Sequence, residues 1–194
     1  NNLITVKAYN NNAELKTQDD SSHRPQMGDI YERYVKECFK SAAMDFDDLL
    51  LKTNELLFRH PDVLHKYQHR FQYVLVDEYQ DTNHSQYLIV KALAALNENI
   101  CVVGDDAQSI YSFRGANIRN ILNFKSDYSD VKLIKLEQNY RSTKNIVSAA
   151  NSVISKNKDQ FDKEVWTSND LGDRIKVNRA MTDSDEAVIV ASNI

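Results

Sequence analysis

Two adjacent carboxylates, Asp77 and Glu78, follow directly on the short apolar run 71–76. This run is rich in β-branched and aromatic side chains, which is typical of a strand buried on both faces of a parallel sheet. Ligands of such sheets bind beyond the carboxyl ends of the strands. Phosphoryl transfer to water needs one carboxylate to hold Mg²⁺ and a second group to orient or deprotonate the water. Asp77 and Glu78 can divide these roles, although the pair alone fits a solvated acidic turn equally well.

The chain after Glu78 has the pattern of a helix and a second strand. Asn83 and Gln86 have the spacing of a capping box, and residues 85–96 carry apolar side chains at helical spacing. Residues 100–103 are again apolar. Strand, helix and strand predict a right-handed βαβ unit, in which the carboxyl ends of both strands lie at one edge of the sheet.

Three polar side chains follow the second strand: Asp105, Asp106 and Gln108. The βαβ geometry is expected to bring them beside Asp77 and Glu78. An amide is useful there, because it can touch a γ-phosphate or its attacking water without adding charge. Without further evidence, Gln108 fits a turn residue better than a nucleotide contact.

The segment that follows the second strand at this sheet edge carries two aromatic side chains and an arginine: Tyr111, Phe113 and Arg114. They could stack on unpaired bases and contact a phosphate, with stacking worth about 1–3 kcal/mol per base. The alternative is that both rings belong to the core.

A third strand is expected over residues 131–136, followed by a helix over residues 143–155 that Ser142 is placed to cap. Tyr140 and Arg141 lie at this junction. An arginine there could reach across a cleft to a transferring phosphate, where such a finger is worth roughly 10³–10⁵ in rate. A surface ion-pair residue is the alternative for Arg141.

The expected elements at the two ends of the chain are less marked. Residues 1–29 are polar, and we expect poor order there, with a loop over residues 18–24. Residues 29–43 predict an amphipathic helix, and Asp45 should cap a second helix that ends before Pro61. Near the C-terminus we expect a loop packed by Trp166, a strand at 175–180 and a helix at 184–194 with its apolar side chains inward.

Three segments resemble motifs of one family, and they occur in the family's order. Residues 77–83 resemble motif II, residues 103–116 motif III and residues 136–143 motif IV of the UvrD/Rep/PcrA-type superfamily 1 DNA helicases. The resemblance runs, less densely, from about Asp45 to the C-terminus.

The resemblance implies a role for each candidate in a cleft that binds ATP and Mg²⁺ between two motor domains. It assigns Asp77 and Glu78 to the metal, with Glu78 also the general base, and Gln108 to the coupling of the γ-phosphate to DNA. Arg141 would be the arginine finger, and Tyr140 would stack on the adenine.

The resemblance also implies single-stranded DNA and duplex junctions as partners, contacted by Tyr111, Phe113 and Arg114. The family often has tryptophan at the position of Phe113, so stacking should survive on a smaller ring.

The expected fold class is α/β, with a RecA-like parallel sheet flanked by helices. In the family's terms, residues 1–43 end a helical insertion (1B), residues 44–137 form the C-terminal part of RecA-like domain 1A, and residues 138–194 begin RecA-like domain 2A.

Composition narrows the class of protein. A net charge of −4 gives no global sign of nucleic-acid binding, so DNA contacts must rest on a local patch. Cys38 and Cys101 lie in apolar contexts and fit buried thiols of a reducing compartment. We find no zinc-ligand spacing, no apolar run of about 20 residues and no signal peptide, and therefore expect a soluble cytoplasmic protein without membrane contacts.

The sequence resembles part of an ATP-dependent helicase that moves 3′ to 5′ on single-stranded DNA. None of its four glycines is followed by lysine, so there is no GxxxxGK[ST] phosphate loop, and the family's motifs V and VI would lie beyond Ile194. We therefore expect the isolated chain to be inactive. Two other classes stay open: a subunit of a RecB/AddA-like helicase-nuclease, and a non-catalytic binding module with a helicase-like shape.

Overall fold

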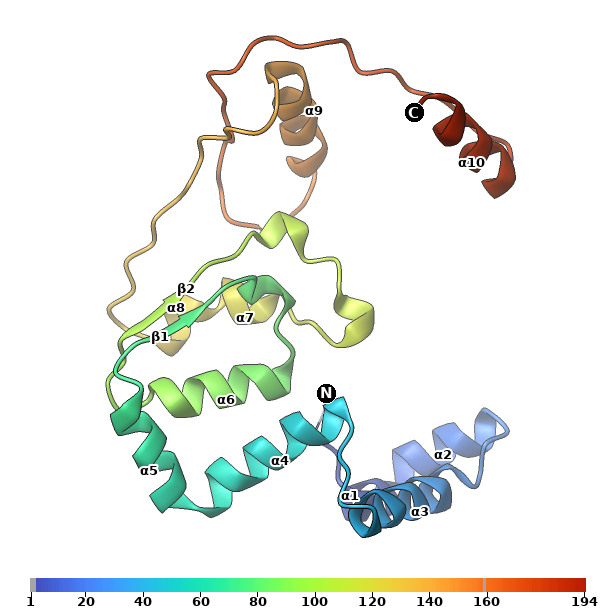
Figure 1. Ribbon diagram of the computed structural model, residues 1–194, viewed down its shortest axis with the longest axis vertical. Coiled ribbons are helices and arrows are strands. Elements are labelled where there is room, and N and C mark those ends of the chain that lie inside the picture. Colours follow the sequence, from blue (N-terminus) through green and yellow to red (C-terminus); the bar gives the residue numbers. More distant parts are fainter. Residues whose placement is uncertain (1–2, 159) are drawn as a thin grey trace. The chain divides into compact units, whose positions relative to one another are not determined.

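The computed structural model describes residues 3–158 and 160–194, and the chain divides into two compact units, residues 1–131 and 132–194. Each unit is described by itself (Figure 1). No helix within the described ranges is long and apolar enough to cross a membrane.

The first unit begins with three helices, where the sequence suggested a loop followed by one helix. They are α1 (Val6–Asn10), α2 (Ala13–Ser21) and α3 (Met27–Lys40). The expected poor order of residues 1–29 is therefore wrong for α1 and α2, and the expected loop over residues 18–24 is wrong where α2 runs to Ser21. Local capping explains the difference, because the Thr5 side chain accepts from a backbone N–H of α1 and the Asn12 side chain accepts from two of α2.

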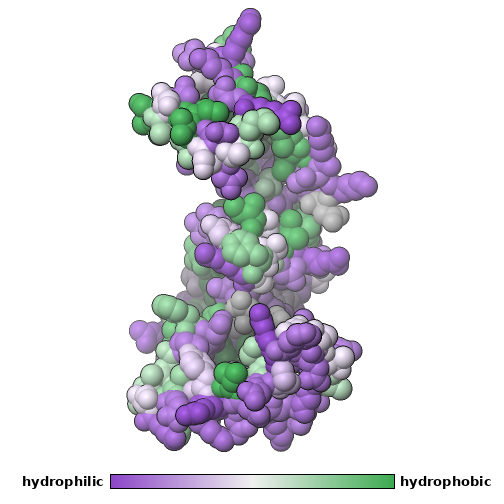
Figure 2. All heavy atoms as spheres, turned by 90° about the vertical axis from the view of Figure 1, so that its right-hand side faces the viewer, coloured by the Kyte–Doolittle hydropathy of each residue, from purple (hydrophilic) through white to green (hydrophobic). Residues whose placement is uncertain are grey.

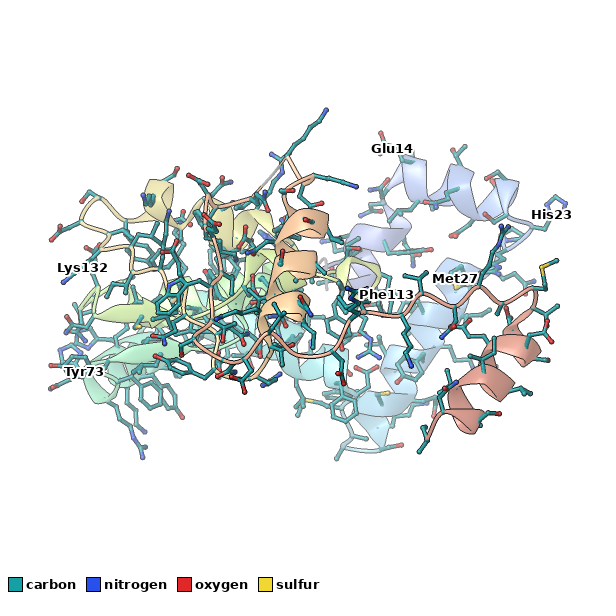
Figure 3. All side chains as sticks on the ribbon, turned by 90° about the horizontal axis from the view of Figure 1, so that it is seen from above. Glu14, His23, Met27, Tyr73, Phe113 and Lys132 are labelled. Atoms are coloured by element: carbon teal, nitrogen blue, oxygen red, sulfur yellow. The ribbon has the colours of Figure 1, made fainter. Side chains whose placement is uncertain are left out.

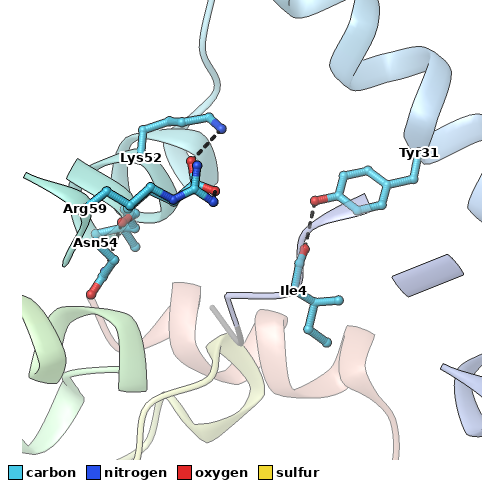
Figure 4. A network of polar contacts seen from close by, with 7 residues as sticks. Ile4, Tyr31, Lys52, Asn54 and Arg59 are labelled. Atoms are coloured by element: carbon cyan, nitrogen blue, oxygen red, sulfur yellow. Dashed lines mark hydrogen bonds and ion pairs between the residues drawn. The ribbon is translucent and has the colours of Figure 1, made fainter. Parts of the chain in front are cut away.

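Side-chain contacts hold these polar helices together. The Tyr31 hydroxyl donates to the carbonyl of Ile4 at 2.9 Å (Figure 4), and the Tyr9 and Tyr31 rings meet edge to face at 5.9 Å. Tyr9 also donates its hydroxyl to Asp19 on α2 at 2.8 Å. The order of the N-terminal segment therefore depends on contacts that its composition does not reveal.

Helix α4 (Phe46–Arg59) is capped as the sequence predicts. The Asp45 carboxylate accepts from the Asp48 backbone, and the Asp48 carboxylate accepts from the Asp45 backbone. The chain then starts α5 (Pro61–Arg70), which the sequence reading missed. Pro61 stands in the first turn of this helix, where its missing N–H has no cost.

Two parallel strands form the sheet of the first unit. They are β1 (Val74–Val76) and β2 (Ile100–Val102), with Val74 opposite Ile100. The connecting helix α6 (His84–Ala94) contacts β1 on one side and α4 and α5 on the other (Figure 1). The βαβ unit and its parallel strands are thus confirmed.

Only one face of this sheet is covered. Alternate residues of a strand face opposite sides, and Leu75 is 75% exposed while its neighbours Val74 and Val76 are half-buried. Cys101, opposite Leu75, is exposed as well. The expectation of strands buried on both faces, and of a buried Cys101 thiol, is therefore wrong for this chain, while Cys38 is half-buried.

The chain beyond β2 consists of short turns and helices. They are the 3₁₀ turns η2 (Asp106–Gln108) and η3 (Ser112–Arg114), followed by α7 (Arg119–Leu122) and α8 (Phe124–Asp127). Tyr79, only 2% exposed, packs edge to face on Phe124 with ring centroids 5.8 Å apart. This contact places the turn after β1 against α8.

The second unit has two helices among its described residues, α9 (Lys144–Ile154) and α10 (Asp183–Ser192). Thr143, not Ser142, occupies the N-cap of α9. A parallel backbone bridge between Gln138 and Trp166 joins the segments before and after α9, while the Trp166 side chain is 50% exposed. No residue of α10 is buried, which makes the expected inward face wrong.

Neither further strand forms in the described chain. Residues 131–136 and 175–180 have no ladder partner. A strand depends on hydrogen bonds to a neighbour, and apolar composition alone does not supply one. Apolar side chains accordingly reach the surface at several places, between hydrophilic ones (Figure 2).

Candidate functional site

The two candidate carboxylates stand on a strained turn at the carboxyl end of β1. Backbone pairing continues past the strand, since Tyr79 donates its N–H to the carbonyl of Val103 at 2.9 Å. Asp77 accepts from the backbone N–H of Glu78 at 2.9 Å. Glu78 itself has φ 51° and ψ 40°, a left-handed conformation that non-glycine residues rarely adopt. Both carboxylates remain exposed, as a ligand site requires.

Gln108 lies on the loop after β2, in the 3₁₀ turn η2. Its side-chain amide donates to the Asp105 carboxylate at 2.7 Å, and the second oxygen of that carboxylate accepts from the backbone of Ala107 at 3.0 Å. Gln108 is exposed, whereas Asp106 is only 5% exposed. Asp105 therefore orients the turn that presents Gln108.

Tyr111, Phe113 and Arg114 form one cluster, as the DNA-binding interpretation requires. The two ring centroids are 5.9 Å apart, and the Arg114 guanidinium carbon lies 5.3 Å from the Tyr111 centroid and 5.5 Å from that of Phe113. Tyr111 is 39% and Phe113 76% exposed, so neither is a core aromatic in this structure. Phe113 and Tyr73 lie at opposite ends of the sheet (Figure 3).

The loop that carries this cluster returns to the turn after β1. Ala116 forms an antiparallel bridge with Asn83, and Asn117 donates its N–H to the carbonyl of Thr82 at 3.0 Å. The buried amide of Asn120 donates to the same carbonyl at 3.0 Å. The loop 104–117 therefore ends on the segment that begins with Asp77 and Glu78.

Gln80 ties the start of that loop to the same turn. Its side-chain oxygen accepts from the backbone N–H of Asp105 at 3.0 Å, and its side-chain nitrogen donates to Glu78 at 2.8 Å. Its carbonyl accepts from the Ser109 hydroxyl at 3.2 Å. The sequence interpretation gave Gln80 no role, because no local pattern marks it. The βαβ prediction, which brings Asp105 to this edge, was the signal that could have pointed to it.

Tyr140 and Arg141 belong to the second unit. The Asn139 side chain accepts from the backbone N–H groups of Arg141 and Ser142, at 3.0 and 2.8 Å. This turn leaves Arg141 exposed and Tyr140 76% exposed. Among residues 3–158 and 160–194 no carboxylate lies within ion-pair distance of the Arg141 guanidinium.

The donor set fits a magnesium ion that is shared with a nucleotide. No cluster of three or more metal-ligating side chains exists within residues 3–158 and 160–194. Mg²⁺ is commonly held by one or two carboxylates together with phosphate oxygens and waters. Asp77 and Glu78 are exposed carboxylates, which are donors of that kind.

Comparison with known proteins agrees with this arrangement. Residues 1–129 match the UvrD/REP helicase N-terminal domain, and residues 134–194 match the UvrD-like helicase C-terminal domain. Together the two matches cover the turn after β1, the loop after β2 and the junction at Tyr140 and Arg141.

Individual relatives are similar over nearly the whole chain. The chain is 49% identical over 187 residues to a protein named ATP-dependent DNA helicase PcrA from Staphylococcus epidermidis, covering 93% of this chain and 26% of the relative. The corresponding figures for a protein of the same name from Leuconostoc citreum are 49%, 175 residues, 90% and 23%. The chain thus spans about a quarter of the length of the curated relatives that it matches. By both family matches, it belongs to the UvrD/REP helicase family.

Proposed function

We propose that this chain supplies the nucleotide-hydrolysing edge and the DNA-contacting loop of an ATP-dependent DNA helicase, which moves 3′ to 5′ on single-stranded DNA. One observation carries the proposal. A single hydrogen-bonded unit joins the exposed carboxylates of Asp77 and Glu78 to the cluster of Tyr111, Phe113 and Arg114. ATP hydrolysis at the two carboxylates can therefore change the contacts that the cluster of Tyr111, Phe113 and Arg114 makes with DNA.

Each carboxylate has a distinct role in the proposal. Asp77 would hold Mg²⁺, which would neutralise phosphate charge, and Glu78 would also contact the metal and take the proton of the attacking water. A general base must reach the water that it deprotonates. The exposure of Glu78 on its left-handed turn meets that requirement.

The remaining candidate residues also contact the nucleotide in this proposal. Gln108 reports the presence of the γ-phosphate, Arg141 stabilises charge on it, and Tyr140 stacks on the adenine. Repeated closure and opening of the nucleotide cleft would then move the aromatic cluster along the bases. In this proposal residues 1–43, 44–137 and 138–194 correspond to 1B, 1A and 2A.

The 194-residue chain by itself is not expected to turn over ATP. A phosphate loop supplies backbone N–H groups and a lysine for the phosphates, and no glycine of this sequence is followed by lysine. Asp77 and Glu78 can hold the metal side of a nucleotide but not its phosphate chain.

The test uses the whole gene product that contains this chain. ATP hydrolysis with and without single-stranded DNA, and unwinding of duplexes with a 3′ or a 5′ tail, are measured for the unmodified protein and for Glu78→Gln. The proposal expects DNA-stimulated hydrolysis and unwinding from the 3′ tail, both lost in Glu78→Gln. DNA binding without hydrolysis would instead support a non-catalytic module, and preference for the 5′ tail would refute the direction.

A further inference from the structure

Gln80 is among the most deeply buried side chains of the described chain, at 1% exposure. A buried amide is costly unless its hydrogen-bonding groups are satisfied. Its nitrogen donates to Glu78 at 2.8 Å and to Asp81 at 3.3 Å, and its oxygen accepts from the Asp105 backbone at 3.0 Å. The amide is therefore fully engaged, between the turn after β1 and the loop after β2.

The orientation of this amide follows from its partners. A backbone N–H can only donate, so the Gln80 oxygen must face Asp105. Ionised carboxylates can only accept, so the Gln80 nitrogen must face Glu78 and Asp81. The amide cannot rotate by half a turn without losing all three contacts, and this sets one position for the Glu78 carboxylate.

The approach of the loop to Gln80 depends on Gly104. A Cβ atom at this position would lie 2.5 Å from the Gln80 side-chain oxygen and 3.2 Å from the backbone nitrogen of Tyr79. Only a residue without a side chain allows the Asp105 N–H to come within hydrogen-bonding distance of the amide.

The Gln80 amide that bonds the Glu78 carboxylate also bonds the loop 104–117. The bond from Gln80 adds to the left-handed backbone of Glu78 in restricting where that carboxylate can be. The loop 104–117 carries Tyr111, Phe113 and Arg114 and is bonded to Gln80 through Asp105 and Ser109. A shift of the loop must therefore move or break the contact that orients Glu78.

We propose that Gln80 is a positioning residue for ATP hydrolysis, whose buried amide makes the placement of the Glu78 carboxylate depend on the position of the DNA-contacting loop. The inference rests on the proposed function, and it assigns to Gln80 a link between the two ends of the site that acts beside Gln108. At 1% exposure Gln80 is too buried to be a ligand of the nucleotide, and it acts through its bond to Glu78.

The test compares Gln80→Met with Asn54→Ala in the whole gene product. Methionine keeps the shape of glutamine but makes no such hydrogen bonds. Asn54 uses its side-chain amide to bond Leu50 and the fully buried Ser85, away from Glu78, and so controls for a purely structural loss. DNA-stimulated kcat and KM for ATP, basal hydrolysis and thermal unfolding are measured for both.

Gln80→Met is expected to lower DNA-stimulated kcat about tenfold or more. The loss should not exceed the roughly 10²–10⁴-fold that a positioned base contributes in all. KM for ATP should change less than about twofold, because Gln80 does not contact the nucleotide. Asn54→Ala should lose thermal stability and keep its kcat at a temperature where it is folded. Equal loss of kcat in both variants would overturn the proposal.

A double-substitution cycle separates positioning from packing. If Gln80 acts through Glu78, Gln80→Met should have little further effect on kcat in a Glu78→Asp background, where a carboxylate remains for slower hydrolysis but is one methylene too short for the contact with Gln80. Independent, multiplying losses would refute the link. An unmodified protein without ATPase activity would instead contradict the proposed function itself, whereas normal activity of Gln80→Met beside an inactive Glu78→Gln would contradict only this inference.

Discussion

The Arg114 guanidinium lies 5.3 Å from the centroid of the Tyr111 ring, on an exposed loop. Phe113 stands on the same loop with its centroid 5.9 Å from that of Tyr111. A cation over an aromatic face is attracted by the ring electrons, and both rings stay exposed beside it. This arrangement offers stacking surfaces and a positive charge together, which unpaired bases and their phosphates require.

Replacing Phe113 by alanine should weaken single-stranded DNA binding by about 1–3 kcal/mol, because one stacking surface is lost. Fluorescence anisotropy of a labelled oligothymidylate with the whole gene product measures the change, and Phe113→Trp should bind at least as tightly as the unmodified protein. Phe58→Ala is the matched control, since Phe58 is 88% exposed and lies in the last turn of α4. Equal weakening in both alanine variants would contradict the assignment.

Asp77→Asn should raise the Mg²⁺ concentration needed for half-maximal ATP hydrolysis, because a neutral amide is a poorer ligand for a hard cation. The measurement is a magnesium titration of the initial rate at saturating ATP. The companion variant is Asp62→Asn, in the first turn of α5, which should leave the titration unchanged. An unaltered magnesium requirement in Asp77→Asn would show that this carboxylate does not hold the metal.

Asp45 should make the stability of α4 depend on pH. Hydrogen bonds from the Asp48 backbone and then from the Tyr34 hydroxyl lower the pKa of the Asp45 carboxyl below its ordinary value. A lowered pKa stabilises the folded state above the unfolded pKa of about 3.9, and this contribution is lost as the pH falls through the folded pKa. Asparagine caps helices about as well as aspartate. Asp45→Asn should therefore keep the cap and lose only this pH-dependent part.

Urea unfolding of the chain, followed by helical circular dichroism from pH 3 to pH 7, checks this expectation. The free energy of unfolding of the unmodified chain should exceed that of Asp45→Asn by a constant amount at neutral pH, and this difference should shrink below about pH 4. Tyr34→Phe should shrink the difference as well, while Tyr73→Phe, a change on a 71% exposed ring, should not. A difference that is independent of pH would rule out the charged cap.

Gly104→Ala should destabilise the first unit by about 1–3 kcal/mol, the usual cost of forcing an extra methyl group into a packed site. The added Cβ meets the Gln80 side chain and the Tyr79 backbone. Gly28→Ala is the contrasting variant, because Gly28 lies in α3 beside the end of the Asn10 side chain and alanine favours a helix by about 1 kcal/mol. Thermal unfolding of both variants should therefore shift in different directions, and equal shifts would contradict the tight approach at Gly104.

Elements with local causes were predicted correctly from sequence. The cap at Asp45 and the Asn83–Gln86 box depend on residues three positions apart, and the structure contains both. The parallel strands follow from an apolar run, a helix and a second apolar run. Helices α1 and α2 are the exception: their caps at Thr5 and Asn12 are local but were missed, and the Tyr31 contact with Ile4 that helps to hold this segment is distant in sequence.

What the sequence alone determined was therefore the identity of the chemical groups and the edge of the sheet where Asp77 and Glu78 stand. The tertiary structure decided which distant groups meet there. Gln80 and Asp105 are separated by 25 positions, and their contact depends on the strand pairing that carries both segments to one edge. Burial and hydrogen-bond partners are set by the whole fold, and for that reason the role of Gln80 could not be derived from any local pattern.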